Sequence, residues 1–570
     1  MNATTNRQLI VLCDGTNNNL TGQENDTNLV KLAELLARDP DPRRLVFYDP
    51  GVGNPGELPG VTLADKIKNW KERVAGLAFG GGVYENIADC YRFLMREYRE
   101  GDEIFIFGFS RGAFTARSLS GLVNQFGLLA PQLENFVPTL LHVYFSERPV
   151  DASPDGEVAN WKKISEQAVR LLVPESAQYV EMQYVGVWDT VASVGMFPFN
   201  TKFTAKPTIQ NKRFRNVRQA LALDELRAQF GPRAYKDENG DHYQTQRKHK
   251  ATLKQLWFQG DHCDVGGGHA TGESGYSNAA LTWLVSEAVN CGLSLKDANG
   301  PLDTEAKVAA VLKQTYPAPV SLPVVHSQLF NTCLWAVTGL KVRDTQCFKL
   351  DDGTRFELKA NAYSSEPAPG PFPMGTAWTQ ARPKRGLLVA VLMMTVVFFC
   401  LGQMLVQAAS FNDLVFEPLE LLRKAPAFFD ANMGFACWQL TWWWSGGWDA
   451  VLNGRFWAPR WAVVWDFLFI AAYAYALSWF AVRSFARAAG VRTAGAPVSK
   501  FLNALGWSLT LMVFADVFEN ALTWLMITSA MNDLTVLAYA LGIAMSMCAL
   551  AKFVGLAGVG VLILRGWKAG

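Results

Sequence analysis

The sequence predicts an α/β fold, an α/β-hydrolase-like, mostly parallel sheet with helices on both faces, followed by a hydrophobic or amphipathic C-terminal helical module. Two observations predict the sheet. Short β-branched or aromatic runs alternate with helix-like stretches, and one run leads directly into Gly-Phe-Ser-Arg-Gly at residues 108–112. A break in composition predicts the module, since about 22% of residues 1–385 are charged but only about 11% of residues 386–570, against roughly 25% in soluble domains.

Five segments end in Gly or Asp turns and are predicted strands: Arg7–Cys13, Leu45–Tyr48, Glu103–Phe107, Tyr179–Trp188 and Leu253–Gln259. The clearest amphipathic helices are Asp65–Glu72, Tyr84–Arg99 and Arg111–Phe126. Two polar stretches, Pro131–Ser176 and Met196–Val217, interrupt this pattern. Hydrolases place substrate-covering lids in insertions of this kind, so we expect lid-like segments there.

The catalytic domain is predicted over residues 1–385, with a Pro-rich joint at about 361–385, and a membrane-anchoring module over 386–570. Long apolar runs predict its helices: Gly386–Phe411, Trp461–Val482, Phe501–Ala530 and Leu534–Leu564. Asp466, Asp516, Glu519 and Lys552 interrupt these runs, and an unpaired charge at the centre of a membrane costs about 3 kcal/mol or more. Asp516 and Glu519 are spaced i, i+3, so we expect them to share one helix face. Two interpretations therefore stay open, helices that span a bilayer and a helical bundle that docks on one.

The composition argues against several classes of function. Lys and Arg number 53 against 51 Asp and Glu, so the net charge of +2 gives no global attraction to nucleic acid. The nine Cys form no CxxC pair, so we expect free thiols and neither a disulfide framework nor a zinc site, and we predict no cofactor. Leu9–Cys13 supplies only five apolar residues before Asp14, so no secretory signal is expected.

Ser110 is the predicted nucleophile. It lies in a GxSxG match between the strand ending at Phe107 and the helix Arg111–Phe126, which is the strand–turn–helix context that this motif requires. A serine hydroxyl becomes nucleophilic when a neighbouring base removes its proton, and this turn presents the side chain to such a base. The competing interpretation is a Gly-rich turn with an incidental serine, or one that binds phosphate.

Hydrolases of this architecture order their triad Ser, acid, His along the chain. Asp189 closes the strand Tyr179–Trp188 and His262 follows the strand Leu253–Gln259, so we predict Asp189 as the acid and His262 as the base. The sequence leaves alternatives for both roles. They are Asp224, Asp261 or Asp264 as the acid and His269 as the base.

The oxyanion hole is predicted from the backbone N–H of Arg111 together with that of Gly15 or Thr16, in the loop after the first strand. Asp14 would then brace that loop, although an Asp after a first strand is also where some phosphatases bind metal. A metal site at His262, Asp264 and His269 is the other metal interpretation, but no third ligand with a recognisable spacing supports it. We predict no metal.

Five motifs in order resemble one family: LCDGTNN at residues 12–18, GFSRGAF at 108–114, GVWDTV at 186–191, ALDE at 222–225 and GDHCDVGGG at 260–268. Together they resemble the α/β-hydrolase group that contains the family 1 lipase effectors of type VI secretion. The resemblance covers about residues 7–290 and implies Ser110, Asp189 and His262 as the triad. Cys263 stands where these proteins often have Ser, and His269 where an aromatic residue is common.

The resemblance implies a phospholipase A that a contractile secretion system delivers into the periplasm of a rival bacterium. Its implied partners are the phospholipid bilayer, type VI spike components and a cognate immunity protein, with no nucleic acid. An inner-membrane location with a cytoplasmic catalytic domain is the alternative. The alternative functions are an esterase for soluble esters and a membrane-inserting pore or transport protein with a degenerate hydrolase domain.

Overall fold

A computed structural model describes these residues: 6–15, 26–51, 81–145, 173–174, 177, 180–191, 193–194, 201–202, 214–235, 252–270, 274–316, 336–337, 343, 389, 391–393, 396, 467–482, 496–531 and 535–568. The chain divides into two compact units. The first contains Met1–Glu225, Gln229–His326 and Arg343–Pro369, and the second contains Leu226–Ala228, Ser327–Val342 and Gly370–Gly570. The predicted helix Asp65–Glu72 and the predicted boundary at residue 385 lie outside the described residues.

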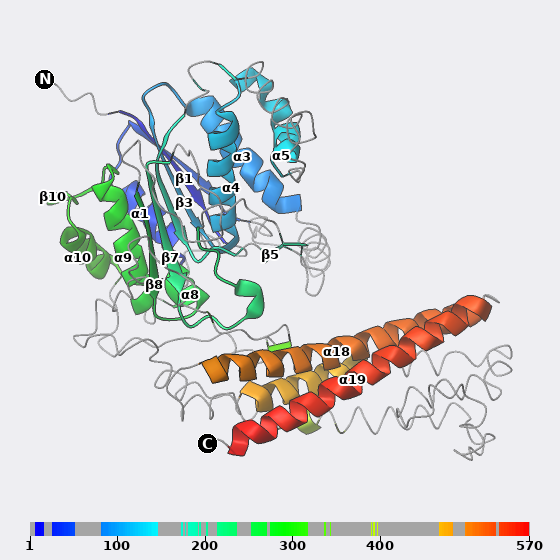
Figure 1. The fold of residues 1–570 in the computed structure, drawn as a ribbon. Coiled ribbons are helices and arrows are strands. Elements are labelled where there is room, and N and C mark those ends of the chain that lie inside the picture. The colour runs from blue at the N-terminus through cyan, green and yellow to red at the C-terminus, as the bar shows by residue number, and fades with distance from the viewer. Residues whose placement is uncertain are drawn as a thin grey trace, which may run out of the picture. The chain divides into compact units, whose positions relative to one another are not determined.

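The first unit is built on a six-stranded sheet in the order β2-β1-β3-β4-β7-β8, and every neighbouring pair is parallel (Figure 1). The strands are β1 (Gln8–Cys13), β2 (Arg44–Asp49), β3 (Glu103–Phe109), β4 (Met182–Trp188), β7 (Asn216–Ala222) and β8 (Thr252–Phe258). The predicted parallel sheet is confirmed, and five strands occupy the predicted segments to within a few residues. The sixth, β7, was not predicted, because Arg218 and Gln219 interrupt its apolar pattern and it begins inside a predicted insertion.

Two antiparallel pairs lie outside the main sheet, β5 (Ser193–Val194) with β6 (Thr201–Lys202) and β9 (Lys296–Asp297) with β10 (Gly300–Pro301). The predicted insertion Pro131–Ser176 begins with the 3₁₀ helix η1 (Pro131–Phe136) and the helix α5 (Val137–Phe145). Most of its remainder lies outside the described residues, so its predicted role as a lid remains a prediction.

The order of the strands reverses at one point of the sheet. From β1 the chain runs to β2 on one side and later returns to β3 on the other, so the strand order reverses between β1 and β3. Cys13 at the end of β1 lies in register with Gly108 of β3. In open α/β sheets, ligands bind where the strand order reverses, beyond the carboxyl ends of the strands. The serine at position 110 follows β3 directly at this point.

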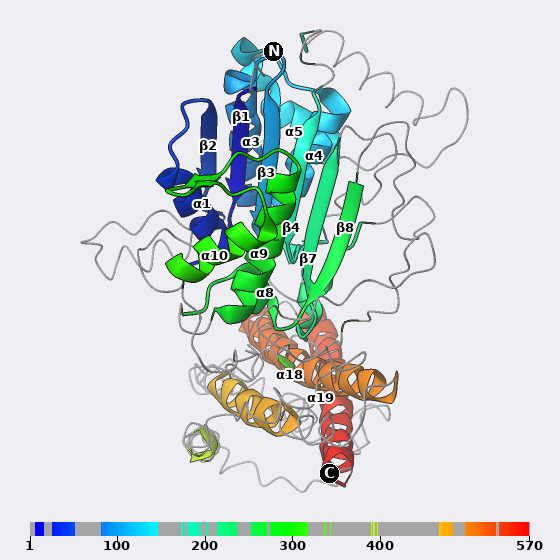
Figure 2. The ribbon, with the colours of Figure 1, turned by 90° about the vertical axis from the view of Figure 1, so that its left-hand side faces the viewer.

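Helices cover both faces of the sheet, as predicted (Figure 2). Alternate side chains of the strands point to opposite faces. Leu9, Val11, Ile104 and Ile106 pack against α3 (Gly81–Glu97), α4 (Ser110–Phe126) and α5. Ile10, Leu12, Phe105 and Phe107 pack against α1 (Asn28–Arg38), α9 (Gly275–Asn290) and α10 (Glu305–Thr315). The sheet is therefore buried on both faces, which explains why β1 and β3 are continuously apolar.

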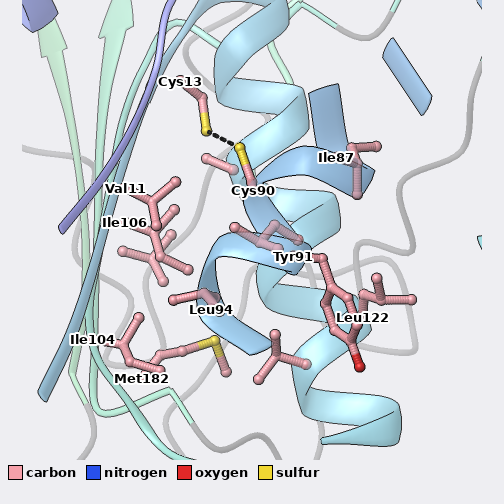
Figure 3. Packing of buried hydrophobic residues seen from close by; sticks show 14 of the residues in the cluster. Val11, Cys13, Ile87, Cys90, Tyr91, Leu94, Ile104, Ile106, Leu122 and Met182 are labelled. Atoms are coloured by element: carbon pink, nitrogen blue, oxygen red, sulfur yellow. Dashed lines mark hydrogen bonds between the residues drawn. The ribbon is translucent and has the colours of Figure 1, made fainter. Parts of the chain in front are cut away.

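Figure 3 shows the face between the sheet and α3, where Val11 and Ile106 point toward Tyr91 and Leu94. At the carboxyl end of β1 the Sγ atoms of Cys13 and Cys90 lie 3.7 Å apart, and both thiols are fully buried. All five cysteines that the structure describes are free, which agrees with the prediction of free thiols.

The described part of the second unit is mostly helical. It contains a helix over residues 467–482, then α18 (Ala496–Met531) and α19 (Thr535–Lys568). A Cβ at Gly555 would lie 2.6 Å from the backbone N of Met512, so this glycine lets α18 and α19 approach closely. Three of the four predicted apolar runs are thus helices, and most of the first run lies outside the described residues.

Three of the charges that interrupt the apolar runs pair with one another, and the fourth, Asp466, lies outside the described residues. Lys552 Nζ of α19 lies 2.8 Å from Asp516 Oδ1 and 2.8 Å from Glu519 Oε2, both on α18. The two carboxylates share one helix face, as their spacing predicted. In the part of the chain that the structure describes, no helix is both long enough and apolar enough to pass through a membrane.

Candidate active site

Ser110 lies in a sharp turn between β3 and α4. Its φ of 58° is one of two positive values among the described non-glycine residues, and such angles are strained for a residue with a Cβ. Glycines on both sides make the turn possible. A Cβ at Gly108 would lie 2.5 Å from Gly112 O, and a Cβ at Gly112 would lie 2.1 Å from Cys13 O. The turn therefore holds the predicted nucleophile in the strained geometry of a nucleophile elbow, at the end of β3 and beside the end of β1.

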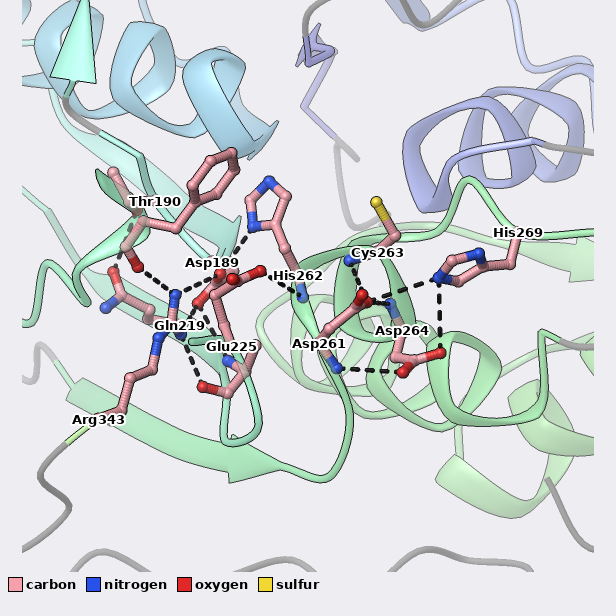
Figure 4. Close-up of polar contacts among 12 residues, drawn as sticks. Asp189, Thr190, Gln219, Glu225, Asp261, His262, Cys263, Asp264, His269 and Arg343 are labelled. Carbon is pink, nitrogen blue, oxygen red and sulfur yellow. Dashed lines mark hydrogen bonds and ion pairs between the residues drawn. The ribbon is translucent and has the colours of Figure 1, made fainter. Parts of the chain in front are cut away.

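Asp189 and His262 form a buried pair, although 73 residues separate them in the chain. Asp189 Oδ2 lies 2.7 Å from His262 Nδ1, and both side chains are almost completely buried (Figure 4). Asp189 follows β4 with a φ of 37°, and its backbone N donates to Ala220 O of β7. His262 opens the short helix α8 (His262–Gly266) after β8. The structure thus brings the predicted acid and the predicted base together at the carboxyl edge of the sheet.

Aromatic rings hold the imidazole of His262 from two sides. The ring of Phe109 stacks on it at 4.7 Å, and the ring of Phe230 meets it edge-on at 5.0 Å. Phe109 precedes Ser110, so the stacking joins the loop of the base to the turn of the serine. Nε2 of His262 is buried and makes no hydrogen bond to any described residue. Because Nδ1 is held by Asp189, Nε2 is the nitrogen left to exchange a proton with a substrate or nucleophile.

Sequence reasoning missed two residues at this pair. Arg343 donates from Nη1 to Asp189 Oδ1 at 2.5 Å and from Nη2 to Asp189 Oδ2 at 2.9 Å. Glu225 Oε2 accepts a hydrogen bond from the backbone N of His262 at 3.4 Å. Glu225 belongs to the ALDE motif at residues 222–225, but the sequence indicated no chemical role for this residue. Arg343 lies in a segment without a strand or motif, and only the tertiary fold brings it here.

The charge state of Asp189 follows from these contacts. Burial acts to raise the pKa of this carboxyl, but the charge of Arg343 and the hydrogen bonds from His262 and Arg343 outweigh it. The pKa of Asp189 therefore lies well below its usual range, and the carboxylate is an anion near neutral pH. An anion at this position holds the proton of His262 on Nδ1, which leaves the lone pair of Nε2 for the role of base.

The alternative acids serve the loop that carries His262. Asp224 Oδ2 accepts from the backbone N of Gly260 at 2.7 Å. Asp261 caps α8 by accepting from the backbone N of Cys263 and Asp264, while Asp264 Oδ2 accepts from the backbone N of Asp261. These carboxylates fix the backbone around the base, and Asp189 is the one of the four that lies against the His262 ring.

The alternative base, His269, lies at a different acidic group. Its Nε2 is 3.5 Å from Asp261 Oδ1 and 3.7 Å from Asp264 Oδ1 (Figure 4). The structure therefore pairs His262, and not His269, with Asp189.

The loop after β1 is braced by Asp14, as predicted. Its Oδ2 accepts from Thr27 Oγ1 at 2.6 Å and from Tyr48 Oη at 2.8 Å, which ties the end of β1 to α1 and β2. Its Oδ1 accepts from the backbone N of Gly15 at 2.6 Å. This N–H is already engaged, so Gly15 can serve an oxyanion only if it shares or exchanges that bond. Thr16 lies outside the described residues.

Arg111 supplies the other predicted oxyanion donor. Its backbone N–H lies in the first turn of α4, where N–H groups have no acceptor within the helix. The positive end of the helix dipole at the same place favours a developing negative charge. The position therefore suits an oxyanion formed beside Ser110, and the assignment stays a prediction.

Two groups of described residues place three potential metal ligands within 4.8 Å of one another, Cys13 with Asp49 and Cys90, and Asp261 with Cys263 and His269. His262 belongs to neither group, and its Nδ1 lies against Asp189. The predicted alternative set of His262, Asp264 and His269 is therefore not assembled. Asp14, the ligand in the rival metal interpretation, accepts hydrogen bonds from Thr27, Tyr48 and Gly15.

A doubly wound parallel sheet with a strained serine turn and a buried Asp–His pair at its carboxyl edge defines an α/β domain of the hydrolase type. Residues 7–287 match the family described as "T6SS, Phospholipase effector Tle1-like, catalytic domain". This match covers just under half of the chain, and it confirms the resemblance predicted from the motifs.

Two individual proteins are also similar. An uncharacterised protein of Saccharomyces cerevisiae, YEL023C, is 31% identical over 225 residues, which are 39% of this chain and 32% of the yeast protein. The chain thus spans about a third of the length of that curated relative. The solved structure titled "Structure of the Tle1 effector bound to the VgrG spike from the Type 6 secretion system" is 17% identical with a TM-score of 0.24, and the match covers 47% of this chain and 52% of that one.

Proposed function

We propose that this chain is a serine phospholipase of the A type, which cleaves acyl esters of membrane phospholipids. The observation that carries the proposal is the buried pair of Asp189 and His262, next to the strained turn of Ser110. The Nε2 atom of His262 makes no hydrogen bond to the part of the chain that the structure describes. The match of residues 7–287 to a phospholipase effector family supports the choice of a lipid ester as substrate.

The reaction would proceed through an acyl-enzyme. Ser110 Oγ attacks the ester carbonyl carbon while its proton passes to His262 Nε2, and Asp189 stabilises the imidazolium that forms. The backbone N–H of Arg111 donates to the oxyanion of the tetrahedral intermediate. Collapse of that intermediate breaks the ester C–O bond, and the lysophospholipid leaves with the proton from His262. Water, activated by the same nitrogen, then attacks the acyl group and releases the fatty acid.

The second unit supplies the proposed means of binding the bilayer. On α18, Trp507, Leu511, Phe518 and Leu525 are each at least 40% exposed and follow a helical repeat of four and seven residues. A continuous apolar stripe on a helix surface is typical of helices that lie in a membrane interface. An enzyme held at the interface reaches the ester carbonyl without extracting the lipid into water.

The proposed biological setting is that of an antibacterial type VI effector. We place its action at the periplasmic membrane face of the target cell, and its partners are a spike component and an immunity protein in the producing cell. The family match of the catalytic domain supports this setting.

The decisive experiment compares the full chain with a Ser110→Ala variant on phosphatidylethanolamine/phosphatidylglycerol vesicles and on a short water-soluble ester. Ser118→Ala is the matched control, because Ser118 is a buried serine of the same helix whose Oγ has no hydrogen-bond partner among the described residues. We expect fatty acid release by the wild type and the Ser118 variant, and its loss on Ser110→Ala by at least about 10⁴-fold. Substrates labelled in one acyl chain identify the position that is cut.

The alternatives give different results in the same experiment. Hydrolysis of the short ester but not of the vesicles would identify an esterase for soluble substrates. Membrane leakage that Ser110→Ala leaves unchanged would identify a pore-forming protein with a degenerate hydrolase domain.

A further inference from the structure

Arg343 makes four hydrogen bonds from a completely buried position. Two go to the carboxylate of Asp189, one from Nη1 to the backbone O of Ala222 at 2.6 Å, and one from Nη2 to the backbone O of Phe230 at 2.5 Å. Its side chain is 2% exposed. The planar guanidinium thus fixes both carboxylate oxygens in one plane and ties them to the end of β7 and to Phe230, whose ring packs on His262.

This arrangement differs electrically from an Asp–His pair without a counter-charge. A carboxylate next to an imidazole stabilises the protonated ring, whereas a fixed cation on the far side of that carboxylate offsets part of this effect. Burial strengthens both interactions, because water is absent from the site. The net charge of the Asp189–Arg343 pair is zero, so His262 faces a dipole and not a full negative charge.

We propose that Arg343 is a positioning residue of this hydrolase, which holds both oxygens of Asp189 in place against His262 and offsets the charge of that carboxylate. The inference rests on the proposed function, because it requires His262 to be the base for Ser110. It adds to the proposed active site a residue that no sequence motif contains. It also predicts that this residue affects the pH at which activity is lost on the acidic side.

Other ionisable groups surround the pair and set the background against which Arg343 acts. Glu225 bonds to the backbone of His262, and Asp224 holds Gly260 at the start of the same loop. Asp261, Asp264 and His269 form a separate group around α8. Arg111 begins α4 beside Ser110. Arg343 is the cation with a direct bond to Asp189 among the described residues, so its removal changes the charge at the pair most directly.

A fluorophosphonate probe measures the activation of the serine without a lipid substrate. Ser110 Oγ forms a bond to phosphorus, the P–F bond breaks, fluoride leaves, and the proton of the hydroxyl passes to His262 Nε2. The labelling rate of the full chain as a function of pH therefore gives an acidic limb whose midpoint reports protonation of the base. The same reagent has no preference for membranes, so the result does not depend on whether phospholipid is the natural substrate.

We compare the wild type with Arg343→Met and Arg343→Lys. In Arg343→Met the loss of the cation stabilises the imidazolium, so the midpoint of the acidic limb should move upward by about one pH unit or more. Labelling should therefore fall about tenfold more at about pH 6 than at about pH 8. Arg343→Lys keeps the charge but cannot bridge both oxygens, so the limb should stay near the wild-type position while the rate at high pH falls.

Arg218→Met is the matched control. Arg218 is equally buried and donates to Glu287 Oε2 at 2.5 Å, but this pair lies against α9 and has no contact with His262 among the described residues. Its loss should lower thermal stability and leave the midpoint of the acidic limb unchanged. An acidic limb of Arg343→Met that coincides with that of the wild type would overturn the inference, since a merely structural arginine predicts that result.

A double variant tests the same inference should Arg343→Met fail to fold. Arg343→Met combined with Asp189→Asn removes both charges, so no unpaired buried charge remains. Because Arg343 acts through Asp189, labelling of the double variant should equal that of Asp189→Asn alone within about threefold. A larger difference would refute the proposed route through Asp189. Absence of labelling in the wild type would instead remove the proposed nucleophile, and with it the proposed function.

Discussion

Asp189→Asn is the substitution for which the structure makes the sharpest prediction. Four N–H groups converge on this carboxylate. Oδ1 accepts from the backbone N of Ala222 at 3.0 Å and from Arg343, and Oδ2 accepts from His262 Nδ1 and again from Arg343. An asparagine of the same shape has only one acceptor oxygen, so its NH₂ group must face donors at one of the two places.

The surrounding donors decide which way the amide turns. At the position of Oδ1 both partners, the backbone N of Ala222 and Arg343, can only donate. At the position of Oδ2, His262 can change tautomer and accept a hydrogen bond through Nδ1. The NH₂ group therefore takes the Oδ2 place and drives the imidazole proton to Nε2. In that tautomer His262 cannot remove the proton of Ser110.

The expected loss of activity is large. The wrong tautomer lowers kcat by about 10⁴-fold in serine hydrolases, which is about 5.5 kcal/mol of transition-state stabilisation. Breaking the buried ion pair also leaves Arg343 uncompensated, and the free energy of unfolding should fall by about 3–5 kcal/mol. Fatty acid release from vesicles gives the first quantity, and urea denaturation followed by tryptophan fluorescence gives the second.

Asp224→Asn is the control, because Asp224 is an equally buried carboxylate near the same loop that does not contact the His262 ring in the described structure. Its activity should stay within about threefold of wild type. An Asp189→Asn variant that keeps more than a tenth of the wild-type rate, or an Asp224→Asn variant that loses as much, would refute the assignment of the acid.

Two further predictions concern stability. Burial raises the pKa of Asp224 to about 7, so the folded state binds more protons than the unfolded state above about pH 4 and stability declines as pH rises toward 7. Asp224→Asn should flatten this decline between about pH 4 and 7, as measured by urea unfolding at each pH. In the second unit, Lys552→Met leaves Asp516 and Glu519 buried without a cation and should lower the free energy of unfolding by about 3–5 kcal/mol. Adding Asp516→Asn and Glu519→Gln should restore most of that loss, and no recovery in thermal melts would contradict the pairing.

The sequence determined most of the fold and the principal candidates for the active-site residues. β1 and β3 are buried on both faces, so their continuous apolar runs were readable without a structure. The turn at Ser110 was readable because only glycines fit at positions 108 and 112, where any Cβ would meet backbone within 2.5 Å. By contrast, β7 was missed because two polar residues occupy it, Gln219 and the ion-paired Arg218.

The tertiary structure decided which of several equivalent residues lies against His262. Chain order alone could not separate Asp189 from Asp224, Asp261 and Asp264, because all four follow strands and become distinguishable only by the atoms that they contact. Arg343 could not be found at all from the sequence, since a lone arginine acquires a role only when folding brings a carboxylate within reach 154 residues away in the chain. Local patterns specify elements because they act over a few residues, whereas the charge environment of a site is a sum over distant segments that only the folded chain brings together.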